Sequence, residues 1–183
     1  DADSHALDEL DAGVSAVLHA QNGPGGTYST NPAVPGGGGM GDVKLLAALG
    51  AGGRMILHQP GPARDHTLRM LRGQGAEIDE TGGVISFNPE NFRLKPLDFT
   101  IPGDMSAAAF LMVAALVVPD SEVTIKGVNT NHTRAGLLEI LRTMGGQIEP
   151  TAEWVEAGEP VADLAVRAGS LQGTEVSGEV VVR

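Results

Sequence analysis

Residues 114–148 read AALVVPDSEVTIKGVNTNHTRAGLLEILRTMGGQI, and residues 47–78 read AALGAGGRMILHQPGPARDHTLRMLRGQGAEI. The two stretches align with one small insertion. The aligned pairs are Leu71 and Arg72 with Leu141 and Arg142, Gly75 with Gly145, Ile78 with Ile148, and Arg64 with Arg134. An internal repeat of this kind indicates a repeated supersecondary unit.

Each copy predicts the order helix, strand, turn, helix, strand, strand. Short strands that alternate with helices favour an α/β fold in which helices pack against a sheet. The first copy predicts a helix at 43–50, a strand at 54–58, a helix at 65–75 and two strands within 76–87. The second copy predicts a helix at 105–118, a strand at 122–127 and a helix at 135–146.

The chain before the first copy predicts less regular structure. Residues 8–23 place apolar side chains at helical spacing and end on Gly23, so they predict a helix and a partial third copy. Residues 24–42 are rich in glycine and proline and predict a loop.

The most apolar segment is IPGDMSAAAFLMVAALVVP at residues 101–119. Gly103 is expected to form a turn, and Asp104 is expected to cap the helix that follows. The uncharged run 107–118 is too short to span a bilayer, which needs about 20 residues. Because this helix is apolar all round, we expect it in the middle of its domain, as the most buried element.

The composition excludes several classes of function. A net charge of −11 and 3% aromatic residues argue against nucleic-acid binding, which uses basic and stacking side chains. The chain has no cysteine, which excludes disulfides, thiolate catalysis and cysteine-based zinc sites. No targeting segment is evident, so we expect no membrane association and a cytoplasmic location.

The segment GPARDH at 61–66 is the best single candidate for a site. Its Gly-Pro turn leads into a helix N-terminus, which favours anions, and Asp65 is a candidate N-cap. Arg64 adds a bidentate donor suited to phosphate or carboxylate. The alternative is a surface arginine beside a capped helix.

Other motifs predict little chemistry. The segment GGGGMG at 36–41 follows no predicted strand and is followed by Asp42 where a phosphate-binding loop would have lysine, which leaves a flexible loop or an anion-binding nest. The surroundings of His66 and His132 do not suggest a metal site or a catalytic triad. The glutamates at 153, 156 and 159 are expected to form a solvated face.

The chain resembles the EPSP synthase family at GPARDHTLRMLRGQGAEI, at RLKPLDFTIPGDMSAAAFLMVAALVVPDSEVTIKGVNTNHTRAGLLEILRTMGGQIEP and at VADLAVR. The resemblance covers about residues 43–183 and is weaker over 1–42. It implies a partial copy of a two-domain α/β fold built from repeated βαβαββ units. Residues 1–100 would belong to the first domain and residues 101–183 to the second.

The resemblance also implies an activity. The family transfers the enolpyruvyl group of phosphoenolpyruvate to the 5-hydroxyl of shikimate 3-phosphate in aromatic amino acid biosynthesis, and glyphosate inhibits it. No cofactor or metal is implied. The family's Ser-Ala-Gln segment, which contacts shikimate 3-phosphate, is Met40-Gly41-Asp42 here, and its Gly-Pro-Ser-Arg is completed by Ala63 and Arg64. Arg64 and Asp42 are therefore the candidate substrate-binding residues, although a carboxylate near an anion is repulsive unless protonated or turned away.

The resemblance leaves two hypotheses open. One is an enolpyruvyl transferase, truncated or naturally short, whose cleft self-association would complete. The other is a non-catalytic piece that folds and binds at most an anion or a complementing chain, because no catalytic acid or base of the family falls on these residues. A chain that holds parts of two domains should also expose an apolar patch that marks an association surface.

Overall fold

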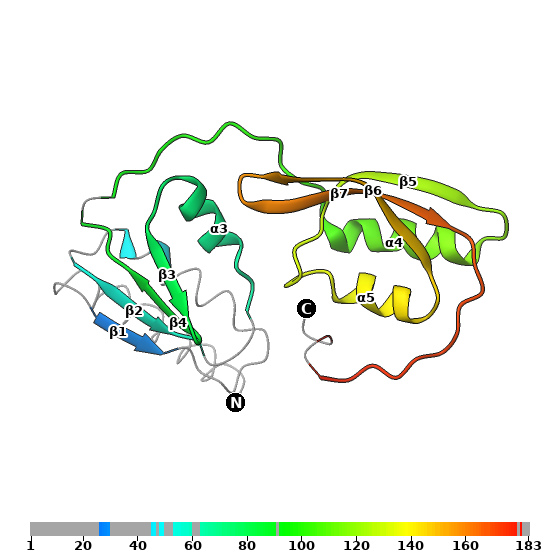
Figure 1. Ribbon diagram of the computed structural model, residues 1–183, viewed down its shortest axis with the longest axis horizontal. Coiled ribbons are helices and arrows are strands. Elements are labelled where there is room, and N and C mark those ends of the chain that lie inside the picture. Colours follow the sequence, from blue (N-terminus) through cyan, green and yellow to red (C-terminus); the bar gives the residue numbers. More distant parts are fainter. Residues whose placement is uncertain are drawn as a thin grey trace, which may run out of the picture. The chain divides into compact units, whose positions relative to one another are not determined.

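The computed structural model describes residues 26–29, 45–46, 48–49, 53–59, 63–90, 92–178 and 180. The chain divides into two compact units, residues 1–97 and 98–183 (Figure 1). Both units combine helices with a small sheet, so the predicted α/β class is confirmed. The helix predicted at 8–23 lies outside the described residues.

The first unit contains a four-stranded sheet in the order β1-β2-β4-β3. β1 runs parallel to β2, and β4 runs antiparallel to both β2 and β3. Helix α3 precedes the β3–β4 hairpin along the chain. The bounds are β1 Gly26–Ser29, β2 Met55–His58, α3 His66–Gly73, β3 Ile78–Thr81 and β4 Val84–Phe87.

The core of the first unit joins two helical segments to the sheet. Leu45 and Ala48 come from the helix predicted at 43–50, where residues 45, 46 and 48 are helical, and Leu68 and Leu71 come from α3. The strands contribute Met55, Leu57, Ile78, Ile85 and Phe87. The apolar residues of the repeat are therefore the ones that hold helices on the sheet.

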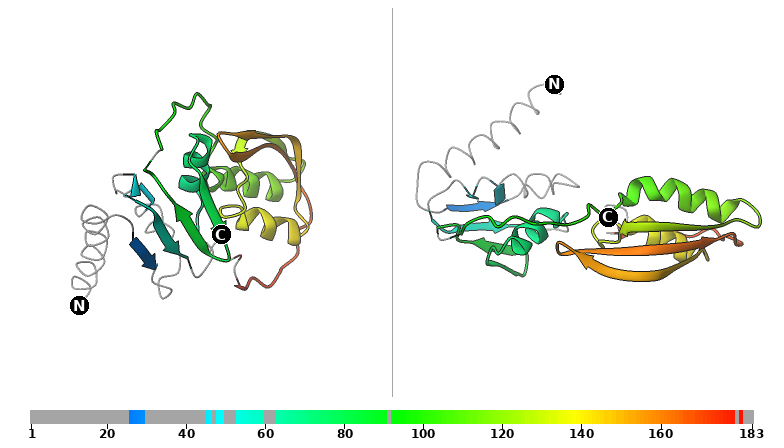
Figure 2. Two further views of the ribbon diagram at one scale, coloured as in Figure 1. Left: turned by 60° about the vertical axis from the view of Figure 1, so that its left-hand side comes forward. Right: turned by 90° about the horizontal axis from the view of Figure 1, so that it is seen from above.

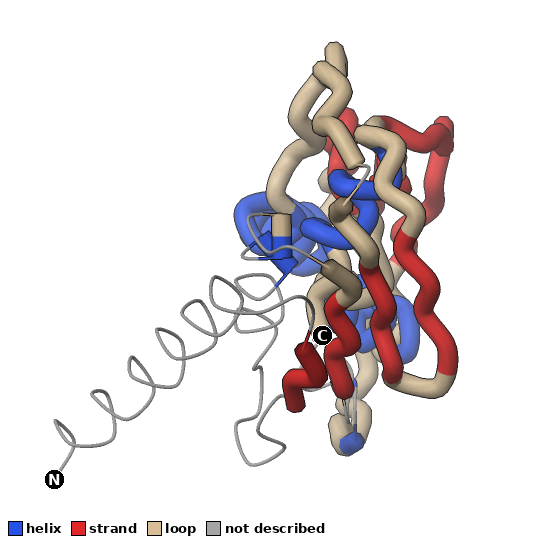
Figure 3. The backbone as a smooth tube through the Cα atoms, turned by 90° about the vertical axis from the view of Figure 1, so that its left-hand side faces the viewer, coloured by secondary structure: helices blue, strands red, loops and turns tan. Residues whose placement is uncertain are grey.

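The second unit contains a three-stranded sheet in the order β5-β7-β6, with both pairs antiparallel. Helices α4 and α5 pack against one face of it (Figures 1 and 3). The bounds are α4 Met105–Val117, β5 Glu122–Asn129, α5 Gly136–Thr143, β6 Gln147–Glu156 and β7 Glu159–Arg167. On β5 the alternate residues Glu122, Thr124 and Lys126 are exposed, so the other face of the sheet is polar at this strand.

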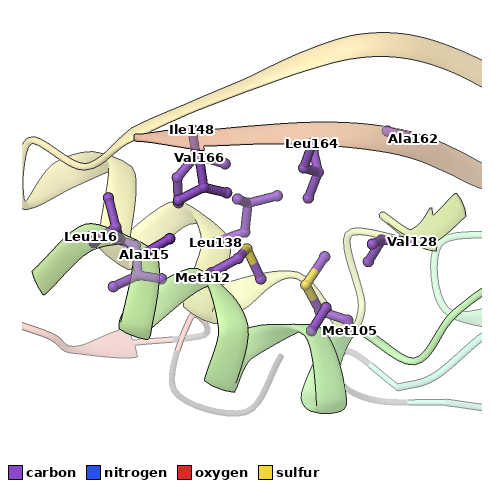
Figure 4. Packing of buried hydrophobic residues seen from close by; sticks show 12 residues of the cluster. Met105, Met112, Ala115, Leu116, Val128, Leu138, Ile148, Ala162, Leu164 and Val166 are labelled. Atoms are coloured by element: carbon purple, nitrogen blue, oxygen red, sulfur yellow. The ribbon is translucent and has the colours of Figure 1, made fainter. Parts of the chain in front are cut away.

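The core of the second unit lies between α4, α5 and the sheet (Figure 4). From α4 come Met105, Ala108, Met112, Ala115 and Leu116, and from α5 come Leu138 and Leu141. The strands contribute Val128, Ile148, Ala162, Leu164 and Val166. Aliphatic and methionine side chains build this core, as the low aromatic content requires.

The two units share one topology. The order β5-β7-β6 repeats the order β2-β4-β3, with the same antiparallel pairing. β1 pairs in parallel with β2, and in the second unit an isolated parallel bridge between Gly103 and Val128 occupies the corresponding place. The predicted βαβαββ repeat is thus confirmed, with its first strand reduced to a single bridge in the second unit.

The C-terminal ends of α3 and α5 share the same backbone conformation and hydrogen bonds. Gly75 and Gly145 have φ of 94° and 90° and follow the two helices at the same position. In each unit the next residue donates its N–H to a leucine carbonyl five residues earlier, Leu71 or Leu141, at 2.9 and 2.8 Å. These are Schellman ends, which require a left-handed residue and favour glycine.

Several sequence expectations differ from the structure. Residues 26–29 form β1 inside the predicted loop 24–42. Gly103 was expected to form a turn, but it has no positive φ and lies in the parallel bridge. A Cβ at this position would lie 3.3 Å from the Gly127 carbonyl oxygen, so the glycine permits the close approach of the two strands. Asp65 is the N-cap residue of α3, as predicted, but its side chain makes no capping hydrogen bond. A further difference concerns α4.

Helix α4 is not the most buried element of the described chain. Its N-cap is the predicted one, because Asp104 accepts hydrogen bonds from the backbone N–H groups of Ser106 and Ala107. One face is buried, but Phe110 on the opposite face is 80% exposed and Val117 is 60% exposed. Figure 2 shows α4 as an outer layer of its unit. The expected exposed apolar patch is therefore present, and it lies on this helix.

Candidate functional site

Arg64 lies in the loop that enters α3, two residues before the first helical residue, His66. Its side chain is exposed, and within the described residues it has no hydrogen bond or ion pair. An exposed guanidinium offers planar, bidentate donors that fit a phosphate or carboxylate group. Arg64 is thus available to a ligand.

The N-terminus of α3 adds to this arrangement. The Asp65 side chain does not cap it, because its carboxylate lies 2.8 Å from the Nη2 and Nε atoms of Arg69. The ion pair compensates the negative charge of Asp65. Uncapped N–H groups at a helix N-terminus attract anions, so the entry to α3 presents two kinds of anion-binding group together.

The second unit uses the corresponding arginine differently. Arg134 stands at the same place before α5, and its Nη2 atom lies 3.2 Å from Asp104 Oδ1 and 2.9 Å from Ser106 Oγ. This arginine ties the entry of α5 to the N-terminus of α4. The arginine at this position of the repeat therefore makes a structural contact in the second unit. In the first unit Arg64 makes no such contact with the described residues.

The contacts of Asp104 change its proton affinity. Its pKa is lowered from the ordinary value of 3.8, chiefly because the carboxylate accepts a hydrogen bond from the Ser106 backbone N–H. The Ala107 N–H and the Arg134 guanidinium lower the pKa further, whereas desolvation opposes the shift. Asp104 therefore remains ionised in the folded chain at acidities where it is protonated in the unfolded chain.

We expect the second unit to lose stability as the pH falls below about 4. A carboxyl group whose folded pKa is depressed stabilises the fold above its unfolded pKa, and this stabilisation is lost as the pH falls through the folded pKa. Asp104→Asn should flatten this acid limb in urea unfolding followed by Trp154 fluorescence. The control Asp98→Asn removes another exposed carboxylate of the same unit, and an acid limb unchanged by Asp104→Asn would contradict the prediction.

A groove of about 580 Å³ opens beside α5 in the second unit. Its floor includes Leu138, Ala162 and Leu164, and its rim carries charges of both signs. The charged or titratable rim residues are His132, Glu139, Arg142 and Glu153. The rim therefore combines acidic and basic side chains and does not favour a ligand of one charge. No sequence motif predicted the groove.

Glu159 contradicts the expectation of a solvated face. Its Oε2 atom accepts hydrogen bonds from the side-chain amides of Asn129 and Asn131, each at 3.0 Å. Asn131 is 0% exposed, so this glutamate satisfies a buried amide and holds the loop after β5. Glu156 accepts a hydrogen bond from the Thr100 N–H at 3.2 Å, and of the three glutamates Glu153 alone is classed as exposed. The spacing of these glutamates in the sequence did not predict this hydrogen-bond network.

Several expected features do not gather into a site. Asp42 and the GGGGMG segment at 36–41 lie outside the described residues. In the described part of the chain no group of three histidines, aspartates or glutamates could hold a metal ion. Nor does any helix there combine the length and apolar character needed to cross a membrane.

The fold and the site together define a class of protein. Tandem βαβαββ units, with an arginine before the second helix of each, form the architecture that the sequence predicts for an enolpyruvyl transferase. A family model described as EPSP synthase (3-phosphoshikimate 1-carboxyvinyltransferase) matches residues 39–180. The chain belongs to the EPSP synthase family.

Curated relatives carry the name 3-phosphoshikimate 1-carboxyvinyltransferase. The protein of Geobacter sp. (strain M21) is 45% identical over 139 residues, and that of Geotalea uraniireducens (strain Rf4) is 48% identical over the same length. Each alignment covers 76% of this chain and 32% of the relative. The chain therefore spans about a third of the length of these relatives.

The fold comparison agrees. A solved structure of EPSP synthase from Acinetobacter baumannii superimposes with a TM-score of 0.78 at 33% sequence identity. The match covers 86% of this chain and 35% of that one. The chain is thus a partial copy of the solved fold.

Proposed function

We propose that this chain takes part in enolpyruvyl transfer from phosphoenolpyruvate to shikimate 3-phosphate, as part of an EPSP synthase. In this reaction the 5-hydroxyl of shikimate 3-phosphate gains the enolpyruvyl carbon, the bond from that carbon to the phosphate oxygen breaks, and inorganic phosphate leaves. The observation that carries the proposal is the family match over residues 39–180. A cytoplasmic location belongs to the same proposal, since both substrates are charged metabolites.

Arg64 is the residue that we propose for shikimate 3-phosphate. Its exposed guanidinium, next to the uncapped N-terminus of α3, suits the 3-phosphate or the carboxylate of this substrate. Asp42 is proposed to lie near the same ligand, where its carboxylate would weaken binding unless it turns away or is protonated. We also propose that residues 1–100 and 101–183 are parts of the two domains of the family.

A second candidate function is supported by charge and by length. The chain carries 12 basic and 23 acidic residues, whereas two phosphates and two carboxylates require converging cations. It also spans 32% of the curated relatives. On its own, the chain could then act as a folded piece that binds shikimate 3-phosphate without turnover, or that joins a complementing chain.

The first test is a titration of the purified chain with shikimate 3-phosphate, followed by the chemical shifts of backbone amides. We expect local shifts at Arg64 and at the first turn of α3. Arg64→Ala should weaken binding at least about tenfold, because a charge-assisted hydrogen bond contributes roughly 1.5–3 kcal/mol. Arg64→Lys should recover only part of this affinity, since lysine lacks the bidentate fork.

The matched control is Arg93→Ala. This residue is an exposed arginine of the same unit whose Nη1 atom donates a hydrogen bond to the Phe92 carbonyl oxygen at 2.8 Å. Equal losses for Arg64→Ala and Arg93→Ala would mean that binding follows overall charge, and no shifts at millimolar ligand would reject the substrate site. Adding phosphoenolpyruvate and measuring phosphate release, with and without glyphosate, then separates the enzyme from the non-catalytic piece.

A further inference from the structure

Two carboxylates on β7 hold polar groups of β5 and of the loop that follows it. Asp163 Oδ1 accepts a hydrogen bond from the Gly127 N–H at 2.8 Å. Glu159 Oε2 accepts from the side-chain amides of Asn129 and Asn131, each at 3.0 Å. The two acidic residues are four positions apart on the strand, so both lie on one face of the sheet, and the core side chains of β7 lie on the other.

Asp163 stands where the neighbouring strand β5 bulges. The register of the β5–β7 ladder shifts between Ile125 and Val128, so two residues of β5 lie opposite Asp163 alone. One of them is Gly127, whose φ of 64° is in the left-handed region that a glycine bulge uses. Because the Asp163 carboxylate accepts the N–H of this glycine, it stabilises the bulge.

The bulge in turn binds the chain that enters the second unit. The Gly103 N–H donates to the Gly127 carbonyl at 2.7 Å, and the Asn129 N–H donates to the Gly103 carbonyl at 2.9 Å. These two hydrogen bonds form the parallel bridge between Gly103 and Val128. Each β7 carboxylate therefore holds one of the two residues that bind Gly103.

The loop after β5 depends on the same glutamate. Asn131 is 0% exposed, and its Oδ1 atom accepts hydrogen bonds from the N–H and hydroxyl groups of Thr133, each at 3.0 Å. The Asn131 carbonyl accepts from the Arg134 N–H at 2.8 Å. Through Asn131, Glu159 thus fixes the backbone of Arg134, whose Nη2 atom lies 3.2 Å from Asp104 Oδ1.

We propose that Glu159 and Asp163 are positioning residues that together set the Arg134–Asp104 ion pair at the N-terminus of α4. Asp163 positions the carboxylate partner, because Asp104 directly follows the glycine that the bulge binds. Glu159 positions the arginine partner through the loop after β5. Every contact in this network lies within residues 98–183, so the segment that enters the second unit is a fixed part of that unit.

The pKa of Asp104 reports whether the ion pair is in place. This pKa is lowered chiefly by the hydrogen bond from the Ser106 N–H, and the Arg134 guanidinium lowers it further. Removal of another negative charge would by itself lower the pKa of the remaining carboxyl group. A rise in the pKa of Asp104 after removal of Glu159 would therefore have the opposite sign to the direct charge effect, and it would report loss of the positioning contacts.

The first experiment is an NMR titration of the Asp104 carboxyl group in the purified 183-residue chain. We expect Glu159→Ala to raise its pKa toward the ordinary value. Glu159→Gln keeps an acceptor oxygen for both amides and should raise the pKa less. In an Arg134→Ala background, Glu159→Ala should give a smaller further rise, because the pair is already absent.

The matched control is Glu153→Ala, which removes an exposed glutamate of β6 in the same sheet and should not raise the pKa of Asp104. An unchanged or lowered pKa in both Glu159 variants would overturn the role of this glutamate. An equal rise with and without Arg134 would overturn the route through the arginine.

Hydrogen exchange at the Gly103 amide tests Asp163. Asp163→Ala should speed this exchange at least about tenfold, the size expected when a hydrogen bond to a charged acceptor is lost from the supporting bulge. Asp163→Asn keeps an acceptor oxygen of the same shape and should speed it less. The amides of α5 are the internal control, and they should exchange as in the parent. Faster exchange at Gly103 and α5 alike, or no change at Gly103 in either variant, would show that Asp163 does not position this segment.

Discussion

Leu141→Ala should destabilise the second unit by about 3–5 kcal/mol, the range for a fully buried leucine in a close-packed core. Leu141 is 5% exposed and belongs to the buried cluster that α4, α5 and the sheet form. Its truncation removes apolar contact and leaves a cavity that the surrounding helices and strands cannot close. Because a small unit is only marginally stable, a loss of this size is a large part of its free energy of unfolding.

Urea unfolding followed by fluorescence measures this loss in the second unit, because Trp154 on β6 is the one tryptophan of the chain. Leu137→Ala, at a residue one helical turn away that is 37% exposed, is the matched control and should cost about 1 kcal/mol or less. All variants are compared at one protein concentration, since association would contribute to the apparent stability. Equal losses at the two leucines would show that the core of the second unit is not packed as described.

Gly83→Ala should destabilise the first unit by about 2–4 kcal/mol, from left-handed strain and a backbone clash together. Gly83 is the second residue of the β3–β4 turn and has φ of 75°. A Cβ at this position would lie 2.5 Å from the Gln59 carbonyl oxygen, and Gln59 in turn donates its N–H to the Gly83 carbonyl at 2.7 Å. The clash cannot be relieved without breaking the contact that holds the end of β2.

Gly82→Ala is the matched control, because it has φ of 58° but open space around a new Cβ. It should cost only the strain, about 1–2 kcal/mol. The second unit supports this difference, since Ala157 and Gly158 occupy the corresponding turn with φ of 48° and 87°. Hydrogen exchange at the amides of β2 and β4 measures both variants, and equal protection in the two would contradict the prediction.

The repeat was the part of the fold that the sequence could predict. Local patterns such as the glycine that ends each helix and the capping carboxylate of Asp104 need only neighbouring residues, so they can be found without knowing the packing. Asp65 fits the same capping pattern, but an arginine at i+4 competes for its carboxylate. Strand β1 was missed because its sequence, GTYS, has few apolar residues and lies among glycines and prolines.

The burial of α4 could not be predicted for a different reason. An apolar sequence indicates that a helix can be buried on every side, but such burial requires other elements of the fold to cover each side. In the described chain the sheet and α5 cover one side only. For the candidate site, the position of Arg64 before a helix was predictable, whereas the role of Glu159 was not, because its amide partners come together only in the folded loop.

The constant separation between paired residues of the two repeat copies indicates how the chain arose. Arg64, Leu71, Arg72, Gly75 and Ile78 each have a counterpart 70 positions later with the same type of residue, and both Arg72 and Arg142 donate to the carbonyl of the paired isoleucine, Ile78 or Ile148. Such agreement in both length and contacts indicates that one gene segment was duplicated in tandem. In the described residues the two copies differ at the arginine before each helix, because Arg64 makes no ion pair there whereas Arg134 pairs with Asp104.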